Sequence, residues 1–148
     1  MKRNPPGFTL LEIIIVLFLM TLILGLSVVF FSNFLPSVKF NAAGREIPAM
    51  IRHARSLARM NMESKTFVID LDNKTYGIEG LAAKQISPDY AIKVIDPFAG
   101  EINRGKYSIV FNPAGPMGGG TIILAMRKKV LFIDIDPVTG AVLNREGH

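Results

Sequence analysis

Residues 13–38 form an uninterrupted run of 26 residues without a charged side chain, and this run limits what the chain can fold into. As an α-helix rising 1.5 Å per residue it is roughly 39 Å long, more than the ~30 Å hydrocarbon thickness of a bilayer. A secretory signal has an apolar core of only about 7 to 15 residues, followed by a small-residue cleavage site. The run therefore predicts a membrane-spanning helix.

The charges around this run predict the orientation of the chain in the membrane. Lys2 and Arg3 precede the run, and Lys39 is the first charged residue after it. By the positive-inside rule the N-terminus lies in the cytoplasm and the rest of the chain lies on the periplasmic side. Of the 148 residues, roughly a hundred then remain for one small soluble domain. With no cysteine in the chain, a disulfide framework and thiolate metal sites are excluded.

Helical periodicity continues beyond the predicted span and indicates an amphipathic helix over residues 39–64. Apolar residues recur every three or four positions, which places them on one helix face; they are Phe40, Ala43, Ile47, Ile51, Ala54 and Ala58. Arg45, Arg52, Arg55 and Arg59 fall in a separate sector of the helical wheel. Pro36 and Pro48 each lack a backbone donor, so we expect kinks near them.

Residues 65–148 read as a β domain, because short runs of β-forming residues alternate with turn residues. The expected strands cover residues 66–71, 75–78, 91–95, 107–111, 121–126 and 130–135. Residues 127–129 should turn the last pair, and residues 112–120 read as a loop because they contain two prolines and four glycines. The expected fold class is α+β, in which the apolar face of the long N-terminal helix packs on an antiparallel sheet made from residues 65–146.

Glu12 is the ionisable residue at the cytoplasmic edge of the apolar run. Moving a carboxylate into hydrocarbon costs between about 2.5 and more than 10 kcal/mol, so such a residue is a candidate for function. The alternative is a carboxylate that reaches out to the interface and is favoured by the positive end of the helix dipole.

Residues 7–12 have the sequence Gly-Phe-Thr-Leu-Leu-Glu, and they follow a short basic leader and precede the apolar helix. This arrangement, continued by a small β domain, resembles a type IV prepilin or pseudopilin. The resemblance covers the whole chain and is most specific over residues 1–35. It divides the chain into a leader at residues 1–7, a transmembrane and assembly helix at 8–38, the amphipathic helix and the β domain.

The resemblance implies that a membrane aspartic prepilin peptidase cleaves between Gly7 and Phe8 and that the new Phe8 amine is N-methylated. Glu12 matches the family's glutamate at the fifth mature position, where it would pair with the Phe8 amine of a neighbouring subunit. The partners implied are other pilins or pseudopilins, packed helix to helix, and an inner-membrane assembly platform with its ATPase. The mature protein would leave the inner membrane to join a periplasmic filament.

Residues 51–59, followed by a β hairpin, are similar to the H-type minor pseudopilins of type II secretion and to FimT-like minor pilins. The first resemblance implies a structural filament subunit. The second implies a minor pilin that binds DNA during uptake, with Arg52, Arg55 and Arg59 as the nucleic-acid face. No aromatic residue interleaves with these arginines, which favours a solvated face or one paired with neighbouring subunits. An unprocessed single-pass membrane protein is the third alternative.

We expect no enzyme, cofactor or metal site in this chain. Asp134 and Asp136 are two residues apart on a strand, but two carboxylates are too few for calcium without further oxygen ligands. His53 and His148 belong to no catalytic or metal-binding pattern. The glycines at residues 118–120 lack the strand, loop and helix context of a phosphate-binding loop.

Overall fold

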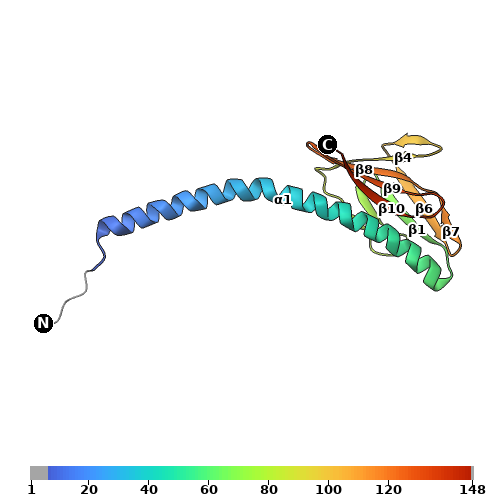
Figure 1. The fold of residues 1–148 in the computed structure, drawn as a ribbon, viewed down its shortest axis with the longest axis horizontal. Coiled ribbons are helices and arrows are strands. Elements are labelled where there is room, and N and C mark those ends of the chain that lie inside the picture. Colours follow the sequence, from blue (N-terminus) through green and yellow to red (C-terminus); the bar gives the residue numbers. More distant parts are fainter. Residues whose placement is uncertain (1–6, 148) are drawn as a thin grey trace. The chain divides into compact units, whose positions relative to one another are not determined.

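The computed structural model describes residues 7–147, without the side chains of residues 28–34. The predicted leader, apart from Gly7, lies outside the described residues. Among the described residues there is one helix, α1 (Leu10–Asn61), and the segments of regular structure after it are strands (Figure 1). It divides into two compact units, of which the second is Phe40–His148 and the first comprises the residues up to Lys39.

The first unit contains the apolar part of α1. Its segment Leu10–Ser27 has a mean hydropathy of 2.7, and none of its residues is buried within the protein. By length and composition this segment can cross a membrane. α1 is helical through both Pro36 and Pro48.

The second unit begins with the amphipathic part of α1, whose predicted apolar face is the face that packs inward. Phe40, Ile47, Ile51, Ala54 and Ala58 are buried, and Ala43 is partly buried against the same core. Since these residues recur every three or four positions, one side of the helix faces the core along its whole length in this unit.

Ten strands form two antiparallel sheets in the second unit. The first sheet has the order β3-β2-β1-β6-β7, and its strands are β1 (Lys65–Asp70), β2 (Thr75–Ile78), β3 (Lys84–Gln85), β6 (Lys106–Asn112) and β7 (Gly115–Met117). The second has the order β10-β9-β8-β4-β5, with β4 (Ala91–Asp96), β5 (Gly100–Ile102), β8 (Gly120–Met126), β9 (Lys129–Ile135) and β10 (Val142–Gly147). The predicted α+β class is confirmed.

Three features of the β domain differ from the sequence prediction. The strands form two sheets rather than one, because β1 pairs with β6 while β4, between them in the chain, pairs with β8. Residues 112–120 are not all loop, because β7 pairs with the end of β6. The two-residue strand β3 and the three-residue strand β5 were also missed, since strands this short carry no readable alternation.

One hydrophobic core joins α1 to both sheets. Phe67, Ile69 and Phe111 come from the first sheet, Leu124 and Ile133 from the second, and all are essentially inaccessible to solvent. The core cluster extends from Phe40 to Ile135. It therefore lies entirely within the second unit.

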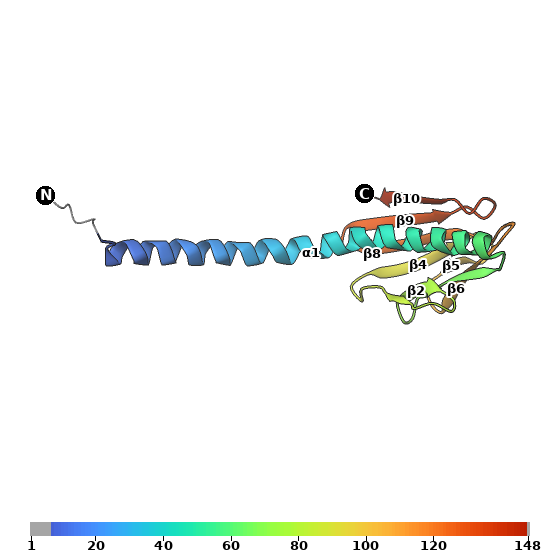
Figure 2. The same cartoon turned by 90° about the horizontal axis from the view of Figure 1, so that it is seen from below.

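Figure 2 shows β10 at the outer edge of the second sheet, beside β9. From this strand Asn144 reaches the amphipathic part of α1 and compensates for Pro48. In a regular helix the N–H of residue 48 would donate to the carbonyl of Gly44, but proline has no N–H. The Asn144 side-chain amide donates to the Gly44 carbonyl instead, at 2.8 Å. Gly44 also permits a close approach, because a Cβ there would lie 2.8 Å from a methyl of Leu131.

Candidate processing and assembly site

The predicted scissile bond precedes the first turn of α1. Residues 7–9 have no regular secondary structure, the helix begins at Leu10, and the Phe8 side chain is 81% exposed. A Cβ at Gly7 would meet no atom within 4 Å. The bond between Gly7 and Phe8 thus lies in accessible, non-helical chain, which is the form a protease can bind.

Thr9 caps the N-terminus of α1. Its Oγ1 accepts a hydrogen bond from the Glu12 N–H at 3.2 Å, and its carbonyl accepts one from the Ile13 N–H at 3.3 Å. The cap satisfies a donor that the first helical turn would otherwise leave free. This role was not predicted above, although the Thr-x-x-Glu spacing of Thr9 and Glu12 is that of a capping box.

Glu12 is the third residue of α1 and is exposed. Its carboxylate stands at the positive end of the helix dipole, where a negative charge is favoured by about 0.3–1 kcal/mol. Within residues 7–147, no cation forms an ion pair with this carboxylate. The carboxylate can therefore accept a charged partner from another molecule.

The helical arginines do not share one environment. Arg52 and Arg59 are exposed, whereas Arg55 is half-buried and its Nη1 donates to the Gly140 carbonyl at 3.4 Å. Its Nε is buried and has no acceptor among the described residues. Arg55 therefore faces the turn between β9 and β10, apart from the other two members of the predicted nucleic-acid face.

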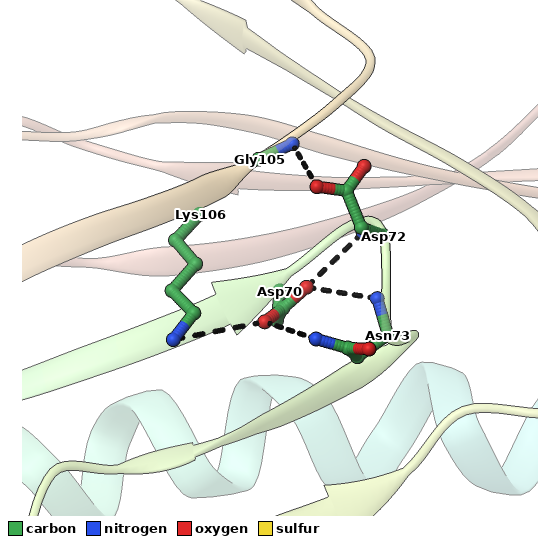
Figure 3. A network of polar contacts seen from close by, with 5 residues as sticks. All are labelled: Asp70, Asp72, Asn73, Gly105 and Lys106. Atoms are coloured by element: carbon green, nitrogen blue, oxygen red, sulfur yellow. Dashed lines mark hydrogen bonds and ion pairs between the residues drawn. The ribbon is translucent and has the colours of Figure 1, made fainter.

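Aspartates of the β domain accept hydrogen bonds from backbone N–H groups in its turns. Asp70 accepts hydrogen bonds from the backbone N–H groups of Asp72 and Asn73 at 3.1 and 2.8 Å, and from the Asn73 side chain at 2.9 Å. Asp72 accepts one from the Gly105 N–H at 3.0 Å, and Lys106 lies 3.8 Å from Asp70 (Figure 3). The bonds from Asn73 are the main reason that the pKa of Asp70 lies below its usual value. This network joins the β1–β2 turn to the chain before β6.

The two aspartates that we considered for calcium have separate partners. Asp134 accepts hydrogen bonds from Thr121 at 2.7 Å and from Arg145 at 2.6 Å, and the bond from Arg145 is the main cause of its lowered pKa. Asp136 follows β9 and caps the next turn through the Thr139 N–H at 2.6 Å. Among residues 7–147 no group of three or more histidine or acidic side chains is placed to hold a metal ion.

Residues 2–28 match a family model, the prokaryotic N-terminal methylation motif. This match identifies the kind of N-terminal segment that the chain has. The chain carries a type IV prepilin-like methylation motif. No curated protein and no solved structure gives a significant match. The methylation motif contains both the predicted scissile bond and Glu12.

The methylation motif indicates a type IV pilin-like protein. It implies processing by a prepilin peptidase followed by assembly with other pilin-like subunits. The apolar segment of α1 fits the single-pass membrane anchoring typical of pilins.

Proposed function

We propose that this protein is a minor pseudopilin of the H type, a structural subunit of the pilus-like filament of a type II secretion system. It is inserted in the inner membrane with its N-terminus in the cytoplasm and its β domain in the periplasm. A prepilin peptidase cuts it after Gly7 and methylates the Phe8 amine. The observation that carries this proposal is the accessible Gly7–Phe8 bond directly before a capped, fully exposed apolar helix.

Assembly uses two properties of the first unit. The apolar side chains of Leu10–Ser27 are exposed in the single chain, so they need either lipid or the helices of other subunits around them. In a dry bundle of helices the Glu12 carboxylate offsets its burial by pairing with the Phe8 amine of a neighbouring subunit. Because Glu12 and Phe8 are four residues apart, about 6 Å of helix rise, this pair fixes the axial stagger between subunits.

The role of the chain in this proposal is structural, and the energy for extraction from the membrane comes from the ATPase of the assembly platform. The β domain is the part displayed on the filament. The amphipathic half of α1 connects it to the filament core, since one continuous helix runs from Leu10 to Asn61.

Co-expression with a prepilin peptidase, followed by intact-mass measurement, tests the processing step. We expect a mature chain that has lost residues 1–7 and gained one methyl group. Gly7→Val should block cleavage without disturbing the fold, because a side chain at Gly7 meets no other atom. A wild-type chain that still starts at Met1 would leave an unprocessed single-pass protein as the better description.

Glu12→Gln tests assembly separately from processing. We expect normal cleavage, a β domain of unchanged stability and loss of the protein from sheared filaments, because the neutral side chain cannot pair with an amine. Thr9→Ser keeps the cap and is the matched control. If Glu12→Gln is incorporated normally, the Glu12 carboxylate is not needed for assembly and acts only at the membrane interface.

A second candidate, a FimT-like minor pilin that binds DNA, is favoured by the exposure of Arg52 and Arg59. Neither arginine forms an ion pair among the described residues, so both can meet phosphates. Gel retardation of duplex DNA with Arg52→Ala/Arg59→Ala tests this candidate, with Arg145→Ala as a control of a paired cation. Retardation that needs Arg52 and Arg59 would favour the uptake pilus over secretion.

A further inference from the structure

The hairpin turn between β8 and β9 lies next to the first residues of the second unit. Phe40 and Asn41 line a depression of about 250 Å³ together with Lys128 and Lys129. Phe40 is the first residue of the second unit and directly follows Lys39, the first charge after the apolar run. The turn is therefore close to the point where the chain enters the domain, whatever the orientation of the domain.

This turn, with Arg127, Lys128 and Lys129, is referred to below as the basic hairpin. All three side chains are exposed, and none forms an ion pair among the described residues. Other cations of the domain do form such pairs: Lys65, Lys84, Lys93, Lys106 and Arg145. Glu146 lines the same depression and offsets only part of the charge. The basic hairpin carries a net positive charge that the domain itself does not neutralise.

The backbone conformation of the basic hairpin is one that arginine adopts less readily than other residues. The strands are joined by two residues, and Arg127 has φ of 56°. Glycine, asparagine and aspartate adopt this conformation more readily than arginine does. The basic residues are therefore present in this turn although other residues would adopt its backbone conformation more easily.

The length of the apolar run places the entry point near the membrane surface. Its 26 residues exceed the hydrocarbon thickness by roughly 9 Å as a helix, so the end of the run reaches the lipid headgroups. Lys39 then lies among the headgroups or just outside them. The basic hairpin lines the same depression as Phe40, and exposed charges interact over roughly 10 Å in 0.1 M salt.

We propose that the basic hairpin binds the anionic lipid headgroups of the membrane surface from which the β domain emerges. This docking rests on the membrane anchoring in the proposed function and holds the domain against the bilayer before assembly. Each cation near an anionic surface changes the ratio of docked to undocked domains about fivefold, since about 1 kcal/mol per charge converts at 1.4 kcal/mol per tenfold. Such binding is reversible and does not prevent extraction.

The test uses the full chain in vesicles of phosphatidylcholine with or without 30% phosphatidylglycerol by mole. The natural chain has no cysteine, so Ala125→Cys places a single fluorophore on β8 beside the basic hairpin. A nitroxide on the lipid headgroups quenches this fluorophore when the domain docks. Thr139→Cys, in the turn between β9 and β10, is the second labelling position. Flotation in alkaline carbonate measures anchoring independently.

We expect quenching at position 125 only with phosphatidylglycerol, and its loss in 0.5 M salt. Lys128→Gln/Lys129→Gln should lower the docked ratio about thirtyfold without changing flotation. Arg127 is not substituted, because its φ is positive and a substitution there would change the backbone as well as the charge. The matched control, Arg52→Gln/Arg59→Gln, removes two exposed cations elsewhere and should leave the quenching unchanged.

Several results would overturn the proposal. Quenching that is equal in neutral vesicles, or equal after Lys128→Gln/Lys129→Gln, removes the role of the charges. An equal loss of quenching in Arg52→Gln/Arg59→Gln would show that the net charge of the protein, and not the basic hairpin, causes the docking. Retardation of duplex DNA that needs Lys128 and Lys129, without any dependence of quenching on anionic lipid, assigns the basic hairpin to nucleic acid. A chain that fails to float refutes the anchoring instead.

Discussion

The hydrogen bond from Asn144 to the Gly44 carbonyl should be worth more than an ordinary surface bond, because Pro48 has removed the other donor. Gly44 is buried, and an acceptor left unsatisfied in such a place costs about 1–3 kcal/mol. We therefore expect Asn144→Ala to lower the free energy of unfolding by about 1.5 kcal/mol. In a Pro48→Ala background residue 48 again donates to Gly44, and the same substitution should cost less than about 0.5 kcal/mol.

The quantity to measure is the coupling energy of this double-mutant cycle, about 1 kcal/mol or more, obtained from urea unfolding followed by circular dichroism. Residues 40–148 are a suitable fragment, since the whole core cluster lies within them. Pro48 is itself buried, so Pro48→Ala also changes packing, but the cycle cancels that effect. Glu146→Ala, on the same exposed strand, is the control. If Asn144→Ala costs the same in both backgrounds, Asn144 does not replace the missing helical donor.

Three further predictions concern single residues. Thr9→Ala should weaken the start of α1 by about 1 kcal/mol, seen as about fivefold faster amide exchange in the first turn of the micelle-bound chain; unchanged exchange would contradict the cap. Arg55→Met should leave the free energy of unfolding unchanged or raise it by up to about 2 kcal/mol. The substitution removes a buried donor that has no acceptor and keeps an apolar side chain of similar length. A decrease in the free energy of unfolding above about 1 kcal/mol would show that the hydrogen bond to Gly140 stabilises the domain. Hydrogen bonds from Thr139 lower the pKa of Asp136, so their stabilisation is present above about pH 4 and is lost as the pH falls through the folded-state pKa. Thermal melts from pH 7 to pH 2.5 should show this loss reduced in Asp136→Asn, and parallel curves would argue against it.

The helical half of the fold follows from local pattern. The spacing of Phe40, Ile47 and Ile51 identifies the face of α1 that is buried, because helical periodicity depends only on residues a few positions apart. Strands β1, β2, β4, β6, β8 and β9 follow from composition in the same way. Their division into two sheets does not, since it depends on which distant strands pair.

In the candidate site, too, the features that depend on neighbouring residues could be predicted and those that depend on distant residues could not. Gly7, Phe8 and Glu12 were identified from contiguous sequence, and Thr9 could have been, since its capping signal is equally local. The environment of Arg55 could not be read from the helical wheel, because Gly140, its partner, is 85 residues away. The wheel places side chains around the axis of one helix and gives no information about a turn that packs over them.

The neighbourhood of α1 and β10 also constrains the order of events during synthesis. Gly44 and Asn144 are separated by 100 residues, so the contact between them forms only after all of the residues between them have been made. Until then the Gly44 carbonyl lacks the side-chain donor that replaces the missing N–H of Pro48. This pairing therefore forms late relative to the contacts within α1 and within the hairpins, which join residues much closer in the sequence.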